Sequence, residues 1–297
     1  MNNTTAPSAT PIGFLGLGAM GGNMARQLLL AGYKVIGFDP NTERLTACVS
    51  AGATRAANVE EVVSSANTVL TSLRSSAVFV EVAEKHFLPN ARRGQLFIDL
   101  GTTTAPETRR LAAALSAKGA TLIDAPVSGG PQGAATGTLR IFVGGDAEAV
   151  KRCRPILEVL GEPKRVVYCG PTGTGQVVKG TNQLAMGLGV AAYMEAIAFA
   201  VRTGVNLEAI EQSVGGDDGW RAHFSGIAKQ IMRGNGGTMV VKYPELPYFL
   251  EEAQAQGIEM PLTQALNAFL KDSKHDMLDN MNRPSRSFWR ELIEPTT

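Results

Sequence analysis

The sequence is poor in the residues that build disulfide frameworks and metal sites. It has 3 cysteines and 3 histidines among 297 residues. Cys48, Cys153 and Cys169 are odd in number, scattered and without Cys-x-x-Cys spacing, which argues against disulfide pairing and a zinc site. The histidines are also widely separated, so we expect no metal. This cysteine usage favours a reducing, cytoplasmic location.

An excess of charge of one sign is also missing. The 28 basic residues nearly balance the 27 acidic ones, so no field would concentrate nucleic acid or an anionic membrane. The first residues lack a basic segment followed by an apolar stretch, and we expect no secretory signal. The apolar run after Gln183 contains Glu195, and its uncharged part is shorter than the roughly 18 residues of a membrane span. We therefore interpret it as a buried core helix.

Two kinds of pattern divide the chain. From residue 12 to about 170, short β-rich runs such as IGFLG, KVIGFD and LFIDL alternate with helical patterns, which predicts βαβ units and a mostly parallel sheet. After residue 174 only helix-length segments follow. The turn residues GPTG lie between the two patterns. We predict a doubly wound, Rossmann-like α/β domain over residues 1–170 and an all-α domain over residues 171–297 that begins with a long helix.

A glycine-rich segment, GFLGLGAMGGNMA, lies between a predicted strand and a predicted helix. In a Gly-x-Gly-x-x-Gly motif the first glycine permits a tight turn, the second lets the backbone approach a pyrophosphate, and the third lets helix and strand pack closely. The helix N-terminus favours the anion. A plain strand-turn-helix is the alternative. We expect a dinucleotide to bind the loop formed by Gly16, Leu17, Gly18, Ala19, Met20 and Gly21.

Asp39 ends the next predicted strand, close to the ~20-residue offset of a ribose-binding acid. Its carboxylate would accept hydrogen bonds from the adenosine ribose and repel a 2′-phosphate, which predicts NAD rather than NADP. An Asp-Pro pair also starts turns well, so a purely structural role for Asp39 is the alternative.

The segment GTGQVVKGTNQ gives the long apolar helix a polar beginning. Lys179, Asn182 and Gln183 are three and four residues apart, so they share one helix face. A lysine there, desolvated by apolar neighbours, would have a pKa lowered toward the range in which it can exchange the proton of an alcohol. A solvated lysine beside two ordinary amides is the alternative.

The segment DAPVSGGPQGAATGTL is a glycine-rich loop after a predicted strand, and its backbone N–H groups suit an anion such as a carboxylate. Together with GLGAMGGNMA and GTGQVVKGTNQ, it resembles the β-hydroxyacid dehydrogenase family, the relatives of 3-hydroxyisobutyrate dehydrogenase and tartronate semialdehyde reductase. The three motifs occur in order, and the resemblance covers nearly the whole chain.

The resemblance implies NAD-dependent, reversible oxidation of a small β-hydroxy acid, or reduction of the matching semialdehyde, by a homodimer or homotetramer. It assigns the catalytic lysine to Lys179 and its partner to Asn182. It places a carboxylate-bearing substrate at Ser128, Gly129, Gly130 and Gln183. It places further cofactor contacts at Leu73, Thr102 and Lys242.

Several positions depart from the family pattern. Tyr243 and Pro244 follow Lys242 where Asp-Leu is common, and Arg74 follows Leu73 where proline is common. Gly101 stands where a serine is usual. These changes leave the identity of the substrate open.

Trp220 and Arg221 stand where small polar residues are usual in the family. Trp220 and Phe224 would line a substrate pocket or simply pack between helices. Arg221 would hold a second anionic group or be solvated.

Two other functions are compatible with this fold. Imine reductases resemble it but generally carry another residue at the position of Lys179. A nucleotide-sensing or scaffold protein would keep the glycines and lose the proton-transfer group, so Lys179 and Asn182 favour an enzyme. The apolar run Leu184–Val201 is apolar all round, which predicts that a second copy covers it.

Overall fold

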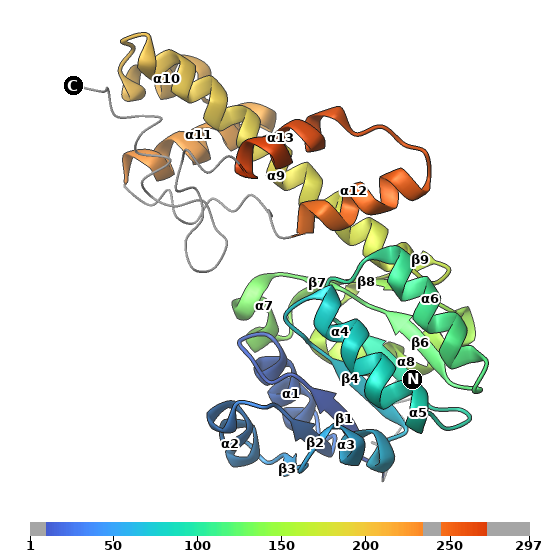
Figure 1. Cartoon of the computed structure of the whole chain (residues 1–297). Coiled ribbons are helices and arrows are strands. Elements are labelled where there is room, and N and C mark those ends of the chain that lie inside the picture. Colours follow the sequence, from blue (N-terminus) through green and yellow to red (C-terminus); the bar gives the residue numbers. More distant parts are fainter. Residues whose placement is uncertain (1–9, 234–244, 272–297) are drawn as a thin grey trace. The chain divides into compact units, whose positions relative to one another are not determined.

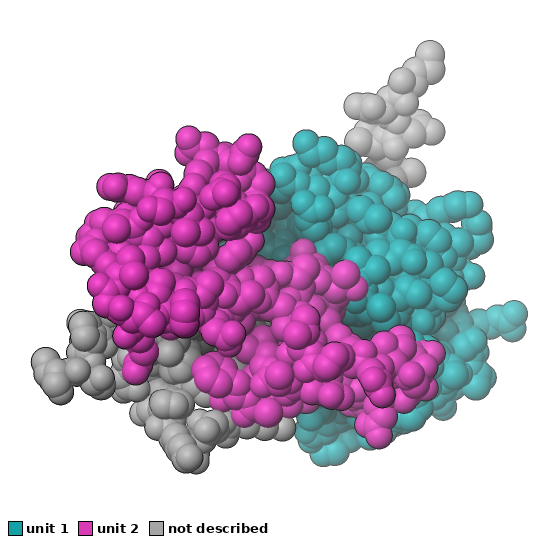
Figure 2. Space-filling view, turned by 90° about the horizontal axis from the view of Figure 1, so that it is seen from above, with its two compact units in different colours: residues 1–179 teal, residues 180–297 magenta. Residues whose placement is uncertain are grey.

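The computed structural model describes residues 10–233 and 245–271 (Figure 1). The chain divides into two compact units, residues 1–179 and residues 180–297 (Figure 2). Each unit has its own hydrophobic core.

The described part of the first unit contains a nine-stranded sheet in the order β3-β2-β1-β4-β5-β6-β8-β7, with β9 paired to β8. The strands from β3 to β6 are parallel to their neighbours, whereas β8 runs antiparallel to β6 and β7 and parallel to β9. The strand bounds are β1 (Ile12–Leu15), β2 (Val35–Phe38), β3 (Thr54–Arg55), β4 (Thr68–Thr71), β5 (Leu96–Asp99), β6 (Thr121–Asp124), β7 (Val127–Ser128), β8 (Leu139–Gly144) and β9 (Gly161–Gly170).

Both faces of the parallel strands are buried, which explains their continuous apolar runs. On β1, Phe14 belongs to one core and its neighbour Leu15 to the other. Successive residues of a strand point to opposite faces, so each strand contributes to both cores. Helices α1 and α8 contribute to the first core, and α3, α4 and α6 to the second. This is the doubly wound arrangement that the alternating pattern predicts.

Four helices of the first unit, α2, α3, α4 and α8, begin at capping residues. Asn41, Asn58, Ser75 and Asp146 each accept a hydrogen bond from a backbone N–H of the first turn, which satisfies a donor that has no partner within the helix. The bounds are α1 (Gly21–Leu30), α2 (Thr42–Ser50), α3 (Val59–Ser65), α4 (Ser76–Val82), η1 (Ala83–Phe87), α5 (Leu88–Asn90), α6 (Ala105–Ser116), α7 (Gly130–Thr136) and α8 (Ala147–Leu160).

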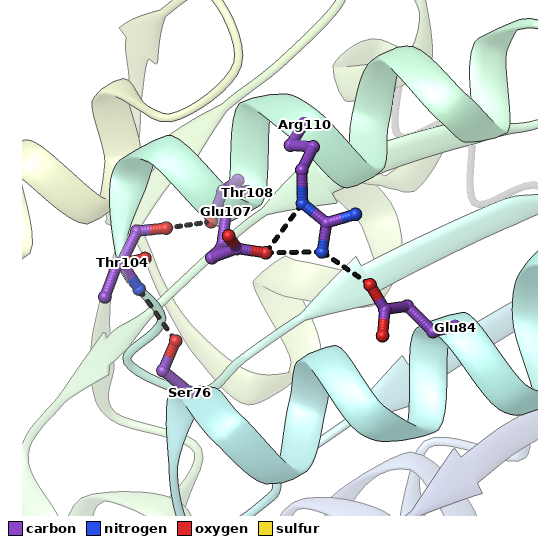
Figure 3. Close-up of polar contacts among 6 residues, drawn as sticks. All are labelled: Ser76, Glu84, Thr104, Glu107, Thr108 and Arg110. Carbon is purple, nitrogen blue, oxygen red and sulfur yellow. Dashed lines mark hydrogen bonds and ion pairs between the residues drawn. The ribbon is translucent and has the colours of Figure 1, made fainter.

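Helix α6 is fixed at its start by a contact with α4 (Figure 3). The backbone N–H of Thr104 donates to Ser76 Oγ at 3.1 Å, within the buried part of the unit. One turn into α6, Arg110 pairs with Glu107 and, at 2.8 Å, with Glu84 of η1. These exposed ion pairs contribute little to stability, so the buried contact at Thr104 does more to position the end of the loop after β5.

The described part of the second unit is helical, as predicted. Helix α9 (Thr174–Arg202) begins in the first unit and continues into the second, followed by α10 (Leu207–Val214), α11 (Gly219–Met232), α12 (Leu246–Ala255) and α13 (Pro261–Lys271). Its core includes Met194, Ile197, Ile210, Phe224 and Ile227.

Helix α9 is long and apolar. By length and composition alone it could cross a membrane: an 18-residue window has a mean hydropathy of 1.8. The expectation in the sequence analysis concerned the uncharged part alone, whereas this window allows up to two charged residues. Core helices of soluble proteins have the same composition, so this is weak evidence for a membrane. Only 22% of the window is buried inside this chain.

Candidate active site

The predicted nucleotide residues of the first unit gather at one edge of the sheet. The loop Gly16–Gly21 follows β1, Asp39 follows β2, Leu73 follows β4 and Thr102 follows β5. These four strands are parallel, so their carboxyl ends meet at the same edge, where open α/β sheets bind their ligands. Leu73 and Thr102 are both half-buried. Lys242 lies outside the described residues.

The three glycines of the loop differ in what a side chain at each position would contact. Gly16 has a φ of +86°, and a Cβ there would overlap the carbonyl oxygen of Ser72. A Cβ on Gly21 would overlap the carbonyl oxygen of Gly16, so this glycine permits close packing of α1. A Cβ on Gly18 would meet no protein atom closer than Arg44 Nη1, at 3.7 Å. The space beside Gly18 is therefore open to a ligand.

A cavity of about 750 Å³ adjoins this loop on the side of α1 and α2. Leu17, Gly18 and Ala19 form one part of its wall, and Arg26 and Arg44 add positive charge. Asp39 and Thr102 do not line it. The cavity therefore extends the surroundings of the glycine loop without reaching the rest of the sheet edge.

Asp39 joins the glycine loop to the turn after β2. Its Oδ2 accepts a hydrogen bond from the backbone N–H of Leu17 at 2.7 Å, and its Oδ1 accepts one from the N–H of Asn41 at 2.8 Å. The bond to Asn41 is the turn contact that an Asp-Pro pair predicts. A carboxylate has about four acceptor sites, so this structural role and a bond to a ribose hydroxyl are compatible.

Lys179 meets the loop that follows β6. Its side chain is only 7% exposed, and its Nζ donates a hydrogen bond to the carbonyl oxygen of Val127 at 2.8 Å. Val127 and Ser128 form β7, so the predicted catalytic lysine lies beside the predicted carboxylate loop. The solvated lysine offered as the alternative does not fit this burial.

The carboxylate loop turns sharply after β7. Gly129 and Gly130 have φ values of +138° and +64°, which favour glycine. A Cβ on Gly130 would meet nothing within 4 Å, and both glycines are exposed. The loop thus exposes backbone N–H groups beside Ser128.

Two buried carboxylates lie at the ends of neighbouring strands of the sheet, and sequence reasoning missed both. Asp99 and Asp124 end β5 and β6 and are partners in the strand register. Asp99 accepts hydrogen bonds from Thr71 Oγ1 at 2.9 Å, Thr103 Oγ1 at 2.7 Å and the N–H of Gly101 at 2.9 Å. Burial raises the pKa of Asp99. The signal in the sequence is the Ile-Asp pair that occurs in both LFIDL and TLIDAP, at the end of each strand.

Asp124 and Gln176 connect the sheet edge to the start of α9. Asp124 accepts hydrogen bonds from the N–H groups of Gly173 at 2.8 Å and Gln176 at 3.1 Å. The side chain of Gln176 accepts from the N–H of Thr103 at 3.1 Å and donates to the carbonyl of Gly101 at 3.0 Å. Burial is the main reason that the pKa of Asp124 rises to about 6.

In the second unit, Asn182 and Gln183 follow Lys179 on α9 by three and four residues. Gln183 is 2% exposed, and its amide nitrogen lies 3.5 Å from Glu245 Oε1. Within the described residues, Gln183 Oε1 and Glu245 Oε2 have no hydrogen-bond partner. Asn182 is half-buried.

The other candidates of the second unit have structural contacts. Arg221 donates to the carbonyl of Val214 at 2.7 Å, and its guanidinium lies 4.6 Å from the centre of the exposed Trp220 ring. Phe224 is buried in the core and contacts Tyr193 edge to face, which is the packing role offered for it. Across residues 10–233 and 245–271, no three His, Cys, Asp or Glu side chains are grouped to hold a metal ion.

Known proteins resemble both halves of the chain. The family model described as the NAD binding domain of 6-phosphogluconate dehydrogenase matches residues 11–170. A second, described as NAD-binding of NADP-dependent 3-hydroxyisobutyrate dehydrogenase, matches residues 173–282. The 3-hydroxyisobutyrate dehydrogenase of Pseudomonas aeruginosa is 37% identical over 290 residues, 91% of this chain and 96% of that protein. The 2-(hydroxymethyl)glutarate dehydrogenase of Eubacterium barkeri is 32% identical over 258 residues, 85% of each chain.

Solved structures give the same result. The 3-hydroxyisobutyrate dehydrogenase of Mycobacterium tuberculosis with L-serine has a TM-score of 0.78 and 26% identity, over 96% of this chain and 99% of that one. An imine reductase from a Pseudomonas species, 22% identical with a TM-score of 0.61 over 97% of this chain and 100% of that one, shares the fold. The chain belongs to the β-hydroxyacid dehydrogenase family, and it is an NAD(P)-dependent dehydrogenase. The family predicted from the three motifs is thus confirmed.

Proposed function

We propose that this enzyme uses NAD to oxidise a small β-hydroxy acid of the 3-hydroxyisobutyrate or tartronate semialdehyde type reversibly, with Lys179 as the general acid/base. The observation that carries the proposal is the hydrogen bond from Lys179 Nζ to Val127, 2.8 Å long, beside Ser128. It supports a proton-transfer group and a carboxylate-binding loop acting on one substrate.

Each residue has a defined task in this mechanism. When bound, the nicotinamide accepts or donates the hydride at its C4. Lys179 exchanges the proton of the substrate hydroxyl. An ammonium carries three hydrogens, and the bond of one of them to Val127 fixes the directions of the others. Asn182, one helical turn further along α9, orients the substrate.

The substrate is held by its carboxylate. We assign this contact to the hydroxyl of Ser128 and the backbone N–H groups of Gly129 and Gly130, supported by the positive φ values of the two glycines. Gln183 contacts the remainder of the substrate, supported by its amide oxygen that has no partner within the described residues. The relatives act on 3-hydroxyisobutyrate and 2-(hydroxymethyl)glutarate, and a third, 36% identical over 68% of this chain and 67% of that protein, is an NAD-dependent L-serine dehydrogenase of Pseudomonas aeruginosa.

The preferred cofactor is NAD. The loop Gly16–Gly21 holds the pyrophosphate, Leu73, Thr102 and Lys242 complete the site, and Asp39 disfavours a 2′-phosphate by like charge. Two observations favour NADP instead: one matching family is described as NADP-dependent, and Arg44 Nη1 lies beside Gly18. The hydrogen bond from Leu17 to the Asp39 carboxylate supports NAD, because it keeps the negative charge against the glycine loop.

The enzyme functions as a cytoplasmic homodimer or homotetramer without nucleic-acid or membrane partners. Little of the apolar 18-residue window of α9 is buried within one chain, which supports a second copy that covers it. Its functional domains are residues 1–170 and 171–297, supported by the two family matches. The compact units divide nine residues later, after Lys179, because the first turn of α9 is bonded to Asp124.

Imine reduction is the second candidate, favoured by the fold shared with the imine reductases. The buried Lys179 speaks against it. The deciding test measures NADH formation from NAD⁺ with 3-hydroxyisobutyrate, 2-(hydroxymethyl)glutarate and L-serine, and NADH consumption with cyclic imines. Turnover of at least one hydroxy acid above all imines is expected. Turnover restricted to imines would overturn the proposal.

A further inference from the structure

The buried carboxylate of Asp124 has no task in the chemistry proposed above. It ends β6 and is 0% exposed, and it accepts hydrogen bonds from Gly173 and Gln176, at the beginning of α9. A helix N-terminus carries partial positive charge and backbone N–H groups without partners inside the helix. The Asp124 carboxylate therefore binds the start of the helix that bears Lys179.

The neighbouring residues are shaped around this contact. A Cβ on Gly144 of β8 would lie 2.7 Å from both carboxylate oxygens of Asp124, and a Cβ on Gly175 would lie 2.8 Å from Oδ2. The Gly175 Cβ would also overlap the carbonyl oxygen of Phe142. Both positions require glycine for Asp124 to approach the helix so closely.

Two contacts connect the loop after β6 to the first turns of α9. The first joins Asp124 to Gln176 at 3.1 Å, and the second joins Val127 to Lys179 at 2.8 Å. The second contact is three residues after the first on both segments. Because three residues are nearly one helical turn, the position of the first turn fixes the height and direction from which Lys179 reaches Val127.

We propose that Asp124 is a positioning residue: its ionised carboxylate holds the first turn of α9 so that Lys179 Nζ lies beside Val127 and Ser128. The proposal rests on the proposed function, in which Lys179 transfers the proton. Asp124 itself does not touch the substrate. Asp99 is the partner of Asp124 in the strand register. Its described hydrogen-bond donors are Thr71, Thr103 and Gly101, none of which belongs to α9.

The contact between the Asp124 carboxylate and the start of α9 depends on the charge of the carboxylate. Both described helix contacts are N–H donors, so a protonated carboxyl presents a donor hydrogen where an acceptor is needed. Burial, with a smaller contribution from the charge of Asp99, raises the pKa of Asp124 to about 6. Cys169 of β9 also faces it, and the charge of Asp124 helps to raise the pKa of that thiol. The N–H groups of Gly173 and Gln176 lower the pKa of Asp124 relative to burial alone, so their hydrogen bonds are stronger to the ionised carboxylate and weaken as the pH falls through about 6.

The test compares Asp124→Asn with Asp99→Asn in the full-length enzyme. Single-turnover NADH oxidation is measured at saturating aldehyde substrate from about pH 5 to pH 8, in the direction in which Lys179 donates its proton, so that protonation of the lysine causes no loss of rate at low pH. NADH affinity is measured by fluorescence titration. The wild type is expected to lose rate below about pH 6. Asp124→Asn should lose about 10²-fold in rate, which is the effect of a small misplacement of a catalytic group. It should keep its NADH affinity, and its rate should no longer fall at low pH. Asp99→Asn should keep the loss of rate at low pH but shift it to lower pH, because the charge of Asp99 helps to raise the pKa of Asp124.

A double variant separates positioning from general stability. If Asp124 acts through Lys179, adding Asp124→Asn to Lys179→Ala causes no further loss of rate. Additive losses, a rate of Asp124→Asn that still falls at low pH, or an unchanged rate would each overturn the proposal.

Hydrogen exchange of the Gly173 and Gln176 amides provides a readout that does not depend on activity. In the wild type their protection should fall as the pH drops through about 6, after correction for the intrinsic rate. This measurement serves even if Asp124→Asn does not fold, and unchanged protection would overturn the proposal. If Lys179→Ala is fully active, the proposed function fails, and the exchange data alone decide whether Asp124 holds the helix.

Discussion

The ammonium group of Lys179 and the backbone carbonyl of Val127 are joined by a hydrogen bond of 2.8 Å. Fifty-two residues separate the two in sequence. The bond directs a flexible side chain toward the glycine loop after β7. This contact defines where the side chain lies in the proton transfer that we propose.

Lys179→Ala should lower kcat by about 10²- to 10⁴-fold, the range that general acid–base groups supply, and leave NADH affinity nearly unchanged. Lys179→Arg should fail similarly, because a guanidinium does not release its proton near neutral pH. Single-turnover NADH formation with saturating substrate measures the chemical step, and fluorescence titration measures the affinity. Near-normal turnover of Lys179→Ala would remove the lysine from the mechanism.

Gly21→Ala and Gly18→Ala should separate folding from cofactor binding. The Gly21 Cβ would overlap the carbonyl oxygen of Gly16, so this variant should lose about 1–3 kcal/mol of stability together with cofactor binding. The Gly18 Cβ finds its nearest protein atom at 3.7 Å, so Gly18→Ala should keep the wild-type Tm and still bind NADH more weakly. Thermal unfolding and NADH titration check both variants. Equal Tm losses would show that Gly18 is also a packing glycine.

Asp39→Asn should shift cofactor preference toward NADP. The amide still accepts one hydrogen bond but no longer repels a 2′-phosphate, so the ratio of NADPH to NADH dissociation constants should fall about tenfold, equivalent to roughly 1.4 kcal/mol. Arg44→Ala is the matched control, since it removes positive charge near the same loop and should raise that ratio. Wild-type protein that binds NADPH more tightly than NADH would contradict the NAD assignment.

Assembly should depend on the apolar surface of α9. Phe199 is 72% exposed in the single chain, and we expect a second copy to cover it. Light scattering at micromolar concentration should report a dimer or tetramer for the wild type and smaller species for Phe199→Glu. Leu30→Glu, at an equally exposed position on α1 of the first unit, should leave assembly unchanged. A monomeric wild type would refute this prediction.

The sheet and the glycine loop could be predicted because their signals are local. Apolar strands such as IGFL and the spacing of Gly16, Gly18 and Gly21 lie within a few residues of each other. The roles of Asp99 and Asp124 could not, because an aspartate at a strand end has the same local sequence whether it binds a ligand, ends a turn or caps a helix. The partners of Asp124 are 49 and 52 residues away, and no periodicity connects them.

The bond between Asp124 and the first turn of α9 also orders events during synthesis. Domains emerge from the ribosome N-terminus first, at about 5–20 residues per second. When β6 has emerged, the carboxylate of Asp124 still lacks its partner, because Gln176 follows 52 residues later. An ionised carboxylate without partners resists burial. The nascent nucleotide-binding unit therefore keeps this edge of its sheet unfinished until the first turn of the next domain's helix has left the exit tunnel.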